Sequence, residues 1–405
     1  MRNKKINLCL ILFFSIIFGF ILYFSVPSKI VLPVGSDFAI KTLPFYSVET
    51  ASDMPTVQCS NGQININSSK MGEFEYNVNV FEAIPFKKLK VSVVPKTYVI
   101  PSGEAVGVKM FTDGLLVVYV SDVIDKVGNR YSPAKDAGLR ETDRILSVDN
   151  LEIGTNEEFS DYINTVRTTV HLKVARDEEV FETDITPVLS NDGSYRIGIW
   201  VRDSTAGIGT LTFYNPQDKS FAALGHAITD CDTKTILTVS DGDLVGCEIL
   251  SVKKGEHGEP GELSGQFKNK VIGKILKNND YGLYGTLENV DTLQSKPIEA
   301  ATRFQIKQGS AQILCDVDGK GVKSYDVEII SVSKEEKTYN KGIVLKVTDE
   351  ELLSKTGGIV QGMSGSPILQ NGRIVGAVTH VFVNDPTRGY GIFIENMLAE
   401  AEKIK

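Results

Sequence analysis

Short apolar runs separated by glycines and turn residues recur along this chain, and they limit its fold more than any other feature. Val- and Ile-rich runs of this length are typical of β-strands bounded by turns. Glycine is frequent, at 36 of 405 residues, and hydrophobic residues make up 42% of the chain. This composition supports a packed core, and the length predicts two or three domains. We therefore expect a mainly β protein of several domains.

The N-terminal segment predicts a membrane anchor. Arg2, Lys4 and Lys5 precede an uncharged stretch over residues 8–26. As a helix, this stretch spans roughly 28 Å, close to the thickness of a bilayer core. The preceding basic residues predict that the N-terminus stays inside and that the rest lies outside. Residues 25–28 make a poor cleavage site, so an uncleaved anchor over residues 1–26 is favoured over a signal peptide.

Charge and cysteine content exclude other classes. The net charge is −8 without a basic block, which argues against nucleic-acid binding. The cysteines lack CxxC spacing, so a zinc site is not expected, and no other metal or cofactor is expected either. One disulfide is possible in an exported protein, but its pairing stays open. The cysteines outside the N-terminal segment are Cys59, Cys231, Cys247 and Cys315.

Residues 27–96 predict a linker and a small β-rich region. Strands are expected over residues 30–34, 74–81 and 88–94, whereas residues 50–72 are polar and rich in turn formers. No residue pattern here indicates chemistry, so a spacer or packing role is expected.

Residues 97–187 predict a second unit. Residues 115–120 form a continuous apolar run, typical of a buried strand. A short helix should end at Gly138, and Thr155 with Glu158 predicts a capping box at the start of another helix. Residues 170–176 and 180–185 should pair as a hairpin.

This unit resembles a PDZ domain of the bacterial type, on the segment SPAKDAGLRETDRILSVDN, although Thr142 stands where a glycine is usual. The resemblance implies a module that adds a peptide strand to a sheet edge and binds a terminal carboxylate on backbone N–H groups. It would place that loop at Val106, Gly107, Val108 and Lys109. The alternative is a PDZ fold used only for intramolecular docking.

Residues 188–405 are again rich in short apolar runs. Asn371-Gly372 between two such runs predicts a hairpin, and residues 394–404 predict a short amphipathic helix. The number of strands in a segment of this size fits a double β-barrel.

The segment Gln361-Gly-Met-Ser-Gly-Ser-Pro367 carries the most specific chemistry. A serine hydroxyl is a weak nucleophile that needs a base and an anion site. Glycines on both sides allow a tight turn in which the N–H groups of Gly362 and Ser364 converge on an oxyanion. The segment matches the Gly-x-Ser-Gly-x-Pro loop of chymotrypsin-like peptidases, which makes Ser364 the nucleophile rather than Ser366. The alternative is an ordinary Gly/Ser turn.

His226, in the segment Leu-Gly-His-Ala, is the best candidate for the base. It follows an apolar strand and has small neighbours that leave room for a substrate. The alternative is a core histidine, and His380 is expected to be packed on its strand. A third group must hold the imidazole tautomer. Spacing does not decide among the carboxylates available for this role: Asp230, Asp232, Asp291, Asp326 and Asp349.

Taken together, the anchor, the PDZ-like unit, ALGHAITD and the segment 356–398 resemble the stage IV sporulation protein B (SpoIVB) peptidases. The resemblance implies a chymotrypsin-like domain with a triad of His226, Asp349 and Ser364. It further implies action between the two membranes of a developing endospore. There the family cleaves a membrane-bound regulator, which triggers sigma-factor processing, and also cleaves itself.

Two other functions remain open at this point. The chain could be an inert binding scaffold in which the PDZ-like unit holds a partner at the membrane. It could also be a processing enzyme that uses Ser366 or His380.

Overall fold

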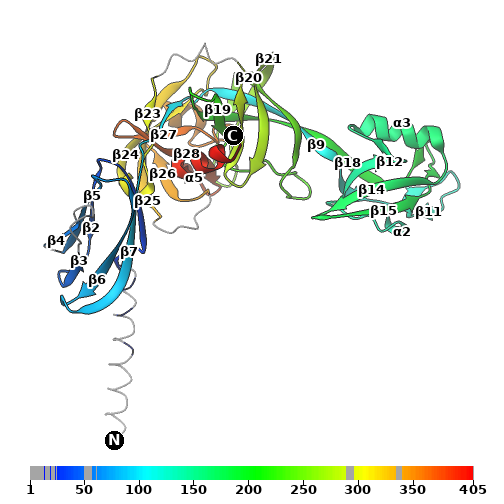
Figure 1. The fold of residues 1–405 in the computed structure, drawn as a ribbon. Helices are drawn as coiled ribbons and strands as arrows, with labels where there is room; N and C mark the ends of the chain where they lie inside the picture. Colours follow the sequence, from blue (N-terminus) through cyan, green and yellow to red (C-terminus); the bar gives the residue numbers. More distant parts are fainter. Residues whose placement is uncertain are drawn as a thin grey trace, which may run out of the picture.

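The computed structural model describes residues 13, 19, 23, 25–49, 57–60, 62–288, 296–333 and 340–404. The predicted anchor over residues 1–26 lies almost wholly outside them. Within the described residues, no helix has the length and apolar character needed to cross a membrane. An N-terminal β domain, a pair of β-barrels and a PDZ domain make up the described chain (Figure 1).

The N-terminal domain packs two small sheets against each other. One holds β1 (Lys29–Pro33), β7 (Ile84–Val94), β6 (Gly72–Val80) and β3 (Tyr46–Glu49), and the other holds β2 (Asp37–Lys41), β5 (Gln63–Asn67) and β4 (Val57–Ser60). The expected strands are present, but the supposedly turn-rich residues 50–72 contain β4 and β5. Strand β5 alternates, with Ile64 and Ile66 buried in the core of the domain and polar side chains between them.

The PDZ domain has the expected local elements. The short helix is α2 (Pro133–Asp136), and Thr155 with Glu158 forms a capping box on α3 (Asn156–Val166). Its main strands are β12 (Arg144–Val148), β14 (Val170–Arg176) and β15 (Glu179–Ile185), of which the last two form the predicted hairpin. Its short strands are β10 (Val123–Ile124), β11 (Arg130–Tyr131), β13 (Leu151–Glu152), β16 (Val188–Leu189) and β17 (Tyr195–Arg196).

Two closed barrels form the centre of the molecule. The first runs through β9 (Ala105–Val120), β20 (Val239–Lys253), β21 (Glu262–Asn279), β22 (Gly282–Leu287), β19 (Ser220–Ala223) and β18 (Ile199–Tyr214), and it closes because β9 also pairs with β18. The second runs through β24 (Gly309–Cys315), β25 (Lys323–Val332), β26 (Ile343–Val347), β29 (Asp385–Phe393), β28 (Arg373–Phe382) and β27 (Pro367–Gln370). The expected mainly β fold with barrels and a PDZ domain is confirmed.

Short elements join the barrels and cover them. Strand β8 (Tyr98–Pro101) pairs with β18 and with β23 (Ile298–Glu299). The helical elements are η1 (Arg303–Gln305), α4 (Glu350–Thr356), α5 (Ile394–Ala401) and η2 (Glu402–Ile404). The last two form the amphipathic C-terminal segment that the sequence predicts, and Ile394 and Met397 are buried with residues of both barrels.

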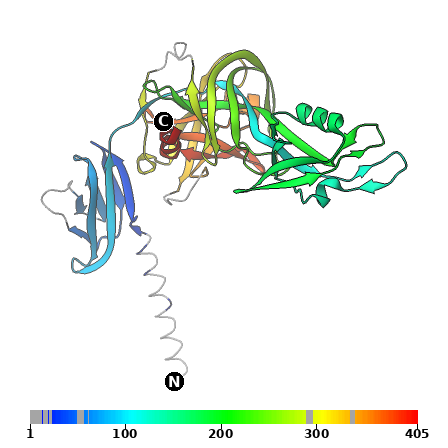
Figure 2. The ribbon, with the colours of Figure 1, turned by 45° about the vertical axis from the view of Figure 1, so that its right-hand side comes forward.

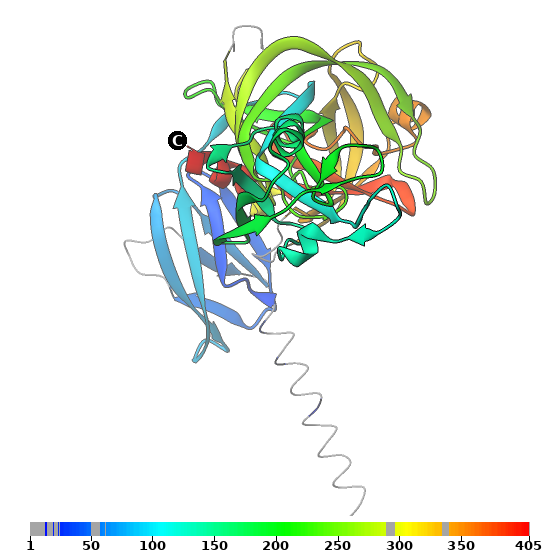
Figure 3. The same cartoon turned by 90° about the vertical axis from the view of Figure 1, so that its right-hand side faces the viewer.

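Strands β9 and β18 run from the PDZ domain into the first barrel (Figures 1 and 2). They pair antiparallel from Ile199↔Val120 in the PDZ sheet to Thr210↔Ala105 in the barrel. The PDZ domain therefore continues past the expected boundary at residue 187, because Ile197 is buried in its core and Ile199 and Val201 pack against that core. Figure 3 looks from the PDZ side and shows this domain in front of the barrels.

The predicted carboxylate-binding loop at Val106, Gly107, Val108 and Lys109 is not a loop. These residues lie within β9, where they pair with β18 on one edge and with β20 on the other. Val106 and Val108 are buried in the core of the first barrel. With both edges paired, the segment has no free backbone groups to receive a peptide, so this prediction is wrong.

A cleft of about 1080 Å³ lies where the N-terminal domain meets the second barrel. It is lined by β2, by η1 and by the hairpin turn at Asn371. Neither Ser364 nor His226 lines it, so its size does not mark it as the catalytic centre.

Candidate active site

The serine loop, residues 361–366, lies between α4 and β27 and requires glycine at two positions. Gly362 and Gly365 have φ values of +98° and +99°. A Cβ on Gly365 would lie 2.1 Å from the carbonyl oxygen of Thr210, and one on Gly362 would lie 3.0 Å from the Leu263 side chain. The turn around Ser364 therefore depends on both glycines, as the motif predicts.

Strand β18 holds the serine loop in place. The Thr210 amide donates to the Ser364 carbonyl at 2.9 Å, and the Thr210 hydroxyl donates to the Gly362 carbonyl at 2.9 Å. The Thr212 hydroxyl donates to the Gly365 carbonyl at 2.8 Å. Sequence reasoning missed both threonines. The sequence pattern that could have identified them is Thr-x-Thr on a buried strand. This pattern places two hydroxyls on one face of the strand, where each needs a hydrogen-bond partner.

Two amides in the serine loop are available for an oxyanion. The Met363 amide donates to Val360 and the Gly365 amide donates to Val378. In the described part of the chain, the amides of Gly362 and Ser364 have no hydrogen-bond acceptor. These are the two N–H groups that the motif predicts for the oxyanion hole, and the structure leaves both free to donate.

His226 lies just beyond β19, in a turn formed by Leu224 (φ +64°) and Gly225 (φ +71°). The imidazole Nδ1 lies 2.8 Å from the carbonyl oxygen of Ala227. Because a carbonyl only accepts, Nδ1 carries the proton and Nε2 carries the lone pair of a base. Burial lowers the pKa of His226 below its usual range, although the Ala227 carbonyl opposes this by stabilising the charged form.

Residues 379–380 of β28 lie against both predicted catalytic side chains. The Ser364 hydroxyl donates to the Thr379 carbonyl at 2.7 Å, and the rings of His226 and His380 lie 4.9 Å apart. In this conformation no hydrogen bond joins Ser364 to His226. Burial lowers the pKa of His380 to about 4, with smaller effects from His226 and Lys341. His380 is therefore a neutral ring at pH 7.

Asp349, the predicted acid, caps a helix. Its carboxylate accepts from the Leu352 amide at 2.9 Å, at the N-terminus of α4, and from the Asp326 amide at 3.3 Å. The group that accepts from His226 Nδ1 is the Ala227 carbonyl instead. In this conformation no hydrogen bond joins Asp349 to the imidazole, and its place in the triad stays a prediction. An aspartate just before a helix is a preferred N-cap, and here one carboxylate oxygen caps α4 while the other accepts from the Asp326 amide.

The other candidate residues are placed as follows. Asp326 accepts from the Gln312 side chain on β24, and Asp291 lies outside the described residues. Ser366 is fully buried and its hydroxyl donates to the Met363 carbonyl, which removes it as an alternative nucleophile. The possible disulfide does not form within the described residues, where all the cysteines are free.

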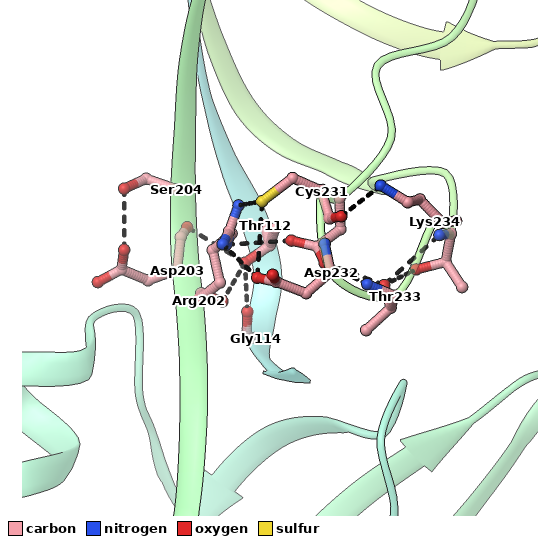
Figure 4. Close-up of polar contacts among 11 residues, drawn as sticks. Thr112, Gly114, Arg202, Asp203, Ser204, Cys231, Asp232, Thr233 and Lys234 are labelled. Carbon is pink, nitrogen blue, oxygen red and sulfur yellow. Dashed lines mark hydrogen bonds and ion pairs between the residues drawn. The ribbon is translucent and has the colours of Figure 1, made fainter. Parts of the chain in front are cut away.

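Asp230 and Asp232 belong to the Arg202 cluster, which we define as Arg202, Asp230, Cys231 and Asp232 (Figure 4). The last three bring ligand atoms within 4.8 Å of one another, as a metal site would. However, the Arg202 guanidinium contacts all three side chains and supplies the positive charge itself. The cluster is therefore an ion-pair network rather than a metal site.

Comparison with known proteins places the chain in a family. The family described as SpoIVB peptidase S55 matches residues 193–398, and the PDZ domain family matches residues 96–186. No curated protein matches the chain.

Solved structures also show similarity. The PDZ domain of the SdrC-like protein (Lmo2051) from Listeria monocytogenes is 29% identical, with a TM-score of 0.19, over 22% of this chain and 87% of that one. The active form of the Rv3671c protease from M. tuberculosis is 13% identical, with a TM-score of 0.30, over 49% of this chain and 74% of that one. The serine protease AL20 from an extremophilic microorganism is 10% identical, with a TM-score of 0.28, over 49% of this chain and 91% of that one.

The family match covers half of the chain and includes both the histidine turn and the serine loop. The chain therefore belongs to the SpoIVB peptidase S55 family and is a serine endopeptidase that carries a PDZ domain.

Proposed function

We propose that Ser364 is the nucleophile and His226 the general base of a chymotrypsin-like peptidase site. One observation supports this most directly. The backbone N–H of Thr210 donates to the Ser364 carbonyl, and the backbone C=O of Thr210 accepts from the Leu224 amide, two residues before His226. A single residue of β18 thus fixes the serine loop against the histidine turn.

The mechanism follows from the tautomer and the free amides. The Ser364 hydroxyl turns away from the Thr379 carbonyl toward His226 Nε2, which takes its proton as the serine attacks the scissile carbonyl. The amides of Gly362 and Ser364 stabilise the oxyanion. The Ala227 carbonyl holds the Nδ1 proton and favours the imidazolium while it exists. His226 then protonates the leaving amine, and water repeats the sequence on the acyl-enzyme.

The substrates in this proposal are proteins. A peptidase of this family with a PDZ domain suits a membrane-bound regulatory protein as substrate, and itself as a second one. Cleavage of such a regulator between the membranes of a developing endospore would start sigma-factor activation in the neighbouring compartment. An N-terminal anchor over residues 1–26 would keep the catalytic domain on the outer side of its membrane. Family membership supports these roles.

The test compares purified wild type with Ser364→Ala and with Ser366→Ala as the matched control. All three are incubated alone and with a protein substrate, and fragments are identified by mass spectrometry. We expect Ser364→Ala to abolish both self-cleavage and substrate cleavage while circular dichroism shows an unchanged fold. Ser366→Ala should retain cleavage. Undiminished cleavage by Ser364→Ala would show that Ser364 is not the nucleophile, whereas a wild type that cleaves neither itself nor the substrate would support the scaffold alternative.

A further inference from the structure

Strand β18 connects the PDZ core directly to the catalytic loops. At its start, Ile199 and Val201 pack against the core of the PDZ domain. Nine or more residues further along, Thr210 and Thr212 hold the serine loop by hydrogen bonds from the Thr210 amide and from both hydroxyls. A displacement of the PDZ domain that moves this strand therefore reaches the active site without passing through a flexible linker.

Arg202 lies on β18 at the point where the strand leaves the PDZ sheet. The pairing of β9 with β18 is irregular between Arg202 and Ser204. There the Thr112 hydroxyl lies within hydrogen-bonding distance of the carbonyl oxygens of Gly114, Arg202 and Asp203. On the PDZ side, the Asn156 amide at the start of α3 donates to the Asp203 carboxylate at 2.9 Å. Elements of both domains thus fix the backbone next to Arg202.

The Arg202 side chain leaves the strand and binds the loop that follows His226 (Figure 4). Its Nε lies 3.0 Å from Asp230 Oδ2, and its Nη2 lies 2.7 Å from Asp232 Oδ2. Its Nη1 lies 3.1 Å from the Cys231 sulfur. Among the described residues, Asp230 Oδ2 has no hydrogen-bond partner, so its contact with Arg202 is an ion pair, whereas Asp232 and Cys231 accept hydrogen bonds from the guanidinium. Three contacts from one guanidinium restrain the loop more than a single ion pair would.

The loop that follows His226 is itself held rigidly by hydrogen bonds. Asp230 is fully buried, and its Oδ1 accepts from the amides of Asp232 and Thr233. Although burial raises the pKa of Asp230, these amides and Arg202 outweigh it and keep the pKa below its usual range. On the opposite side, the Asn278 side chain binds both the amide and the carbonyl of Ile228, two residues from His226. His226 therefore lies at the end of a segment clamped from two sides.

We propose that Arg202 is a positioning residue for His226, which ties the loop after the catalytic histidine to the strand that carries the PDZ domain. The inference rests on the proposed role of His226 as the base. In this arrangement, movement of the PDZ domain relative to the barrels shifts the imidazole as well as the serine loop. Small displacements of a catalytic group cost large factors in rate, so this coupling can set the activity of the enzyme.

The test uses the full chain with three single variants. Arg202→Lys keeps a cation beside the buried Asp230 but loses the three-point contact, and Asp232→Asn removes one partner at an exposed position. Arg144→Lys is the matched control, because Arg144 pairs with Asp113 at the same strand junction and does not contact the histidine loop. Activity is measured with a peptide substrate over a range of pH.

For Arg202→Lys we expect kcat to fall by about 10- to 100-fold while KM changes by less than about twofold. Asp232→Asn should lower kcat by a smaller factor, and the double variant should be no worse than Arg202→Lys alone, because both changes break one network. Arg144→Lys should match wild type. Unchanged kcat in Arg202→Lys and Asp232→Asn would overturn the proposal.

A second measurement does not depend on activity. Histidine resonances are titrated by NMR in the Ser364→Ala background, with and without Arg202→Lys. Among described groups, His380 lies against the imidazole, Lys341 acts on His380, and neither is altered by the substitution. If Arg202 holds this loop in place, Arg202→Lys loosens the loop and exposes His226 to water. The pKa of His226 then rises toward its ordinary value. A pKa of His226 that stays unchanged would contradict the positioning role even if the peptidase assignment holds.

Discussion

At the scale of single residues, backbone carbonyls do much of the orienting in this site. The Ala227 carbonyl fixes the tautomer of His226, and the Thr379 carbonyl holds the Ser364 proton in the described conformation. His380 adds a neutral imidazole ring against the base. The result is a base that is kept uncharged by its surroundings, so the site should tolerate mild acid better than a solvated histidine would.

This arrangement predicts a specific dependence on pH. The folded pKa of His380 is about 4, below the ordinary histidine value of about 6.5 in the unfolded chain. Protonation therefore favours the unfolded state, and the contribution of neutral His380 to stability is present above about pH 6.5 and is lost as the pH falls toward about 4. We expect the free energy of unfolding of wild type to fall more steeply across this interval than that of His380→Gln.

Urea titrations at several pH values measure this difference, with His257→Gln, in an exposed turn, as the control. In parallel, kcat/KM of wild type should hold below pH 6.5 and decline at lower pH, because burial lowers the pKa of His226. Parallel stability curves for wild type and His380→Gln would contradict the buried, neutral state of this ring.

Local sequence was sufficient to select Ser364 and His226 as candidates, because each lies among small residues that the chemistry requires. It was not sufficient for the third group. Several carboxylates had equal claim by spacing, and the partner that the structure shows is a backbone carbonyl, which no sequence pattern marks. The roles of Thr210 and Thr379 depend on contacts across the fold and were likewise not readable from the chain alone.

At the scale of secondary-structure elements, the placement of α4 decides what Asp349 does. The aspartate begins this helix, and its carboxylate satisfies the Leu352 amide, which has no acceptor within the first helical turn. The helix ends at Gly357 in the left-handed conformation, close before the serine loop. Loss of the N-cap of α4 would therefore disturb the chain that leads into the serine loop as well as the stability of the second barrel.

We expect Asp349→Ala to lower the free energy of unfolding by about 1 kcal/mol, the usual cost of removing an N-cap. Asp349→Asn should keep most of the stability, because asparagine caps equally well. Urea denaturation compares the two, and Thr155→Ala, which removes the cap of α3 in the PDZ domain, provides a matched control. A folded Asp349→Asn protein that has lost kcat would support Asp349 as the third member of the catalytic triad.

Elements differed in how well the sequence predicted them. The hairpin at Asn371-Gly372 and the capping box at Thr155 were predictable, since each rests on a local backbone requirement. The long strands β20 and β21 were not predicted, because glycines and charged residues interrupt their apolar pattern. Each has an irregular register with several shifts, and many of their side chains remain exposed to solvent.

At the scale of the whole molecule, the PDZ domain and the first barrel share strands rather than a linker. The sequence suggested a boundary at residue 187 because the PDZ-like pattern ends there. The structure shows that a later segment completes the domain: Ile197 is buried in its core, and residues 199–202 pair with residues 116–120 of β9. Such a boundary depends on contacts between residues far apart in sequence, which local patterns do not reveal.

This architecture predicts how the PDZ domain behaves when it is excised. A fragment of residues 112–203 keeps the β9–β18 pairing of the PDZ sheet, whereas a fragment of residues 112–187 exposes the edge of β9 and the cavity left by Ile197. Since burial of one such side chain contributes about 1.5–3 kcal/mol, the shorter fragment should be less stable by at least about that amount. Urea denaturation followed by circular dichroism measures both, and Ile197→Ala in the longer fragment should fall between them. Equal stability of the two fragments would mean that β18 belongs energetically to the barrel alone, and the strand would then be a poor route for coupling the PDZ domain to the active site.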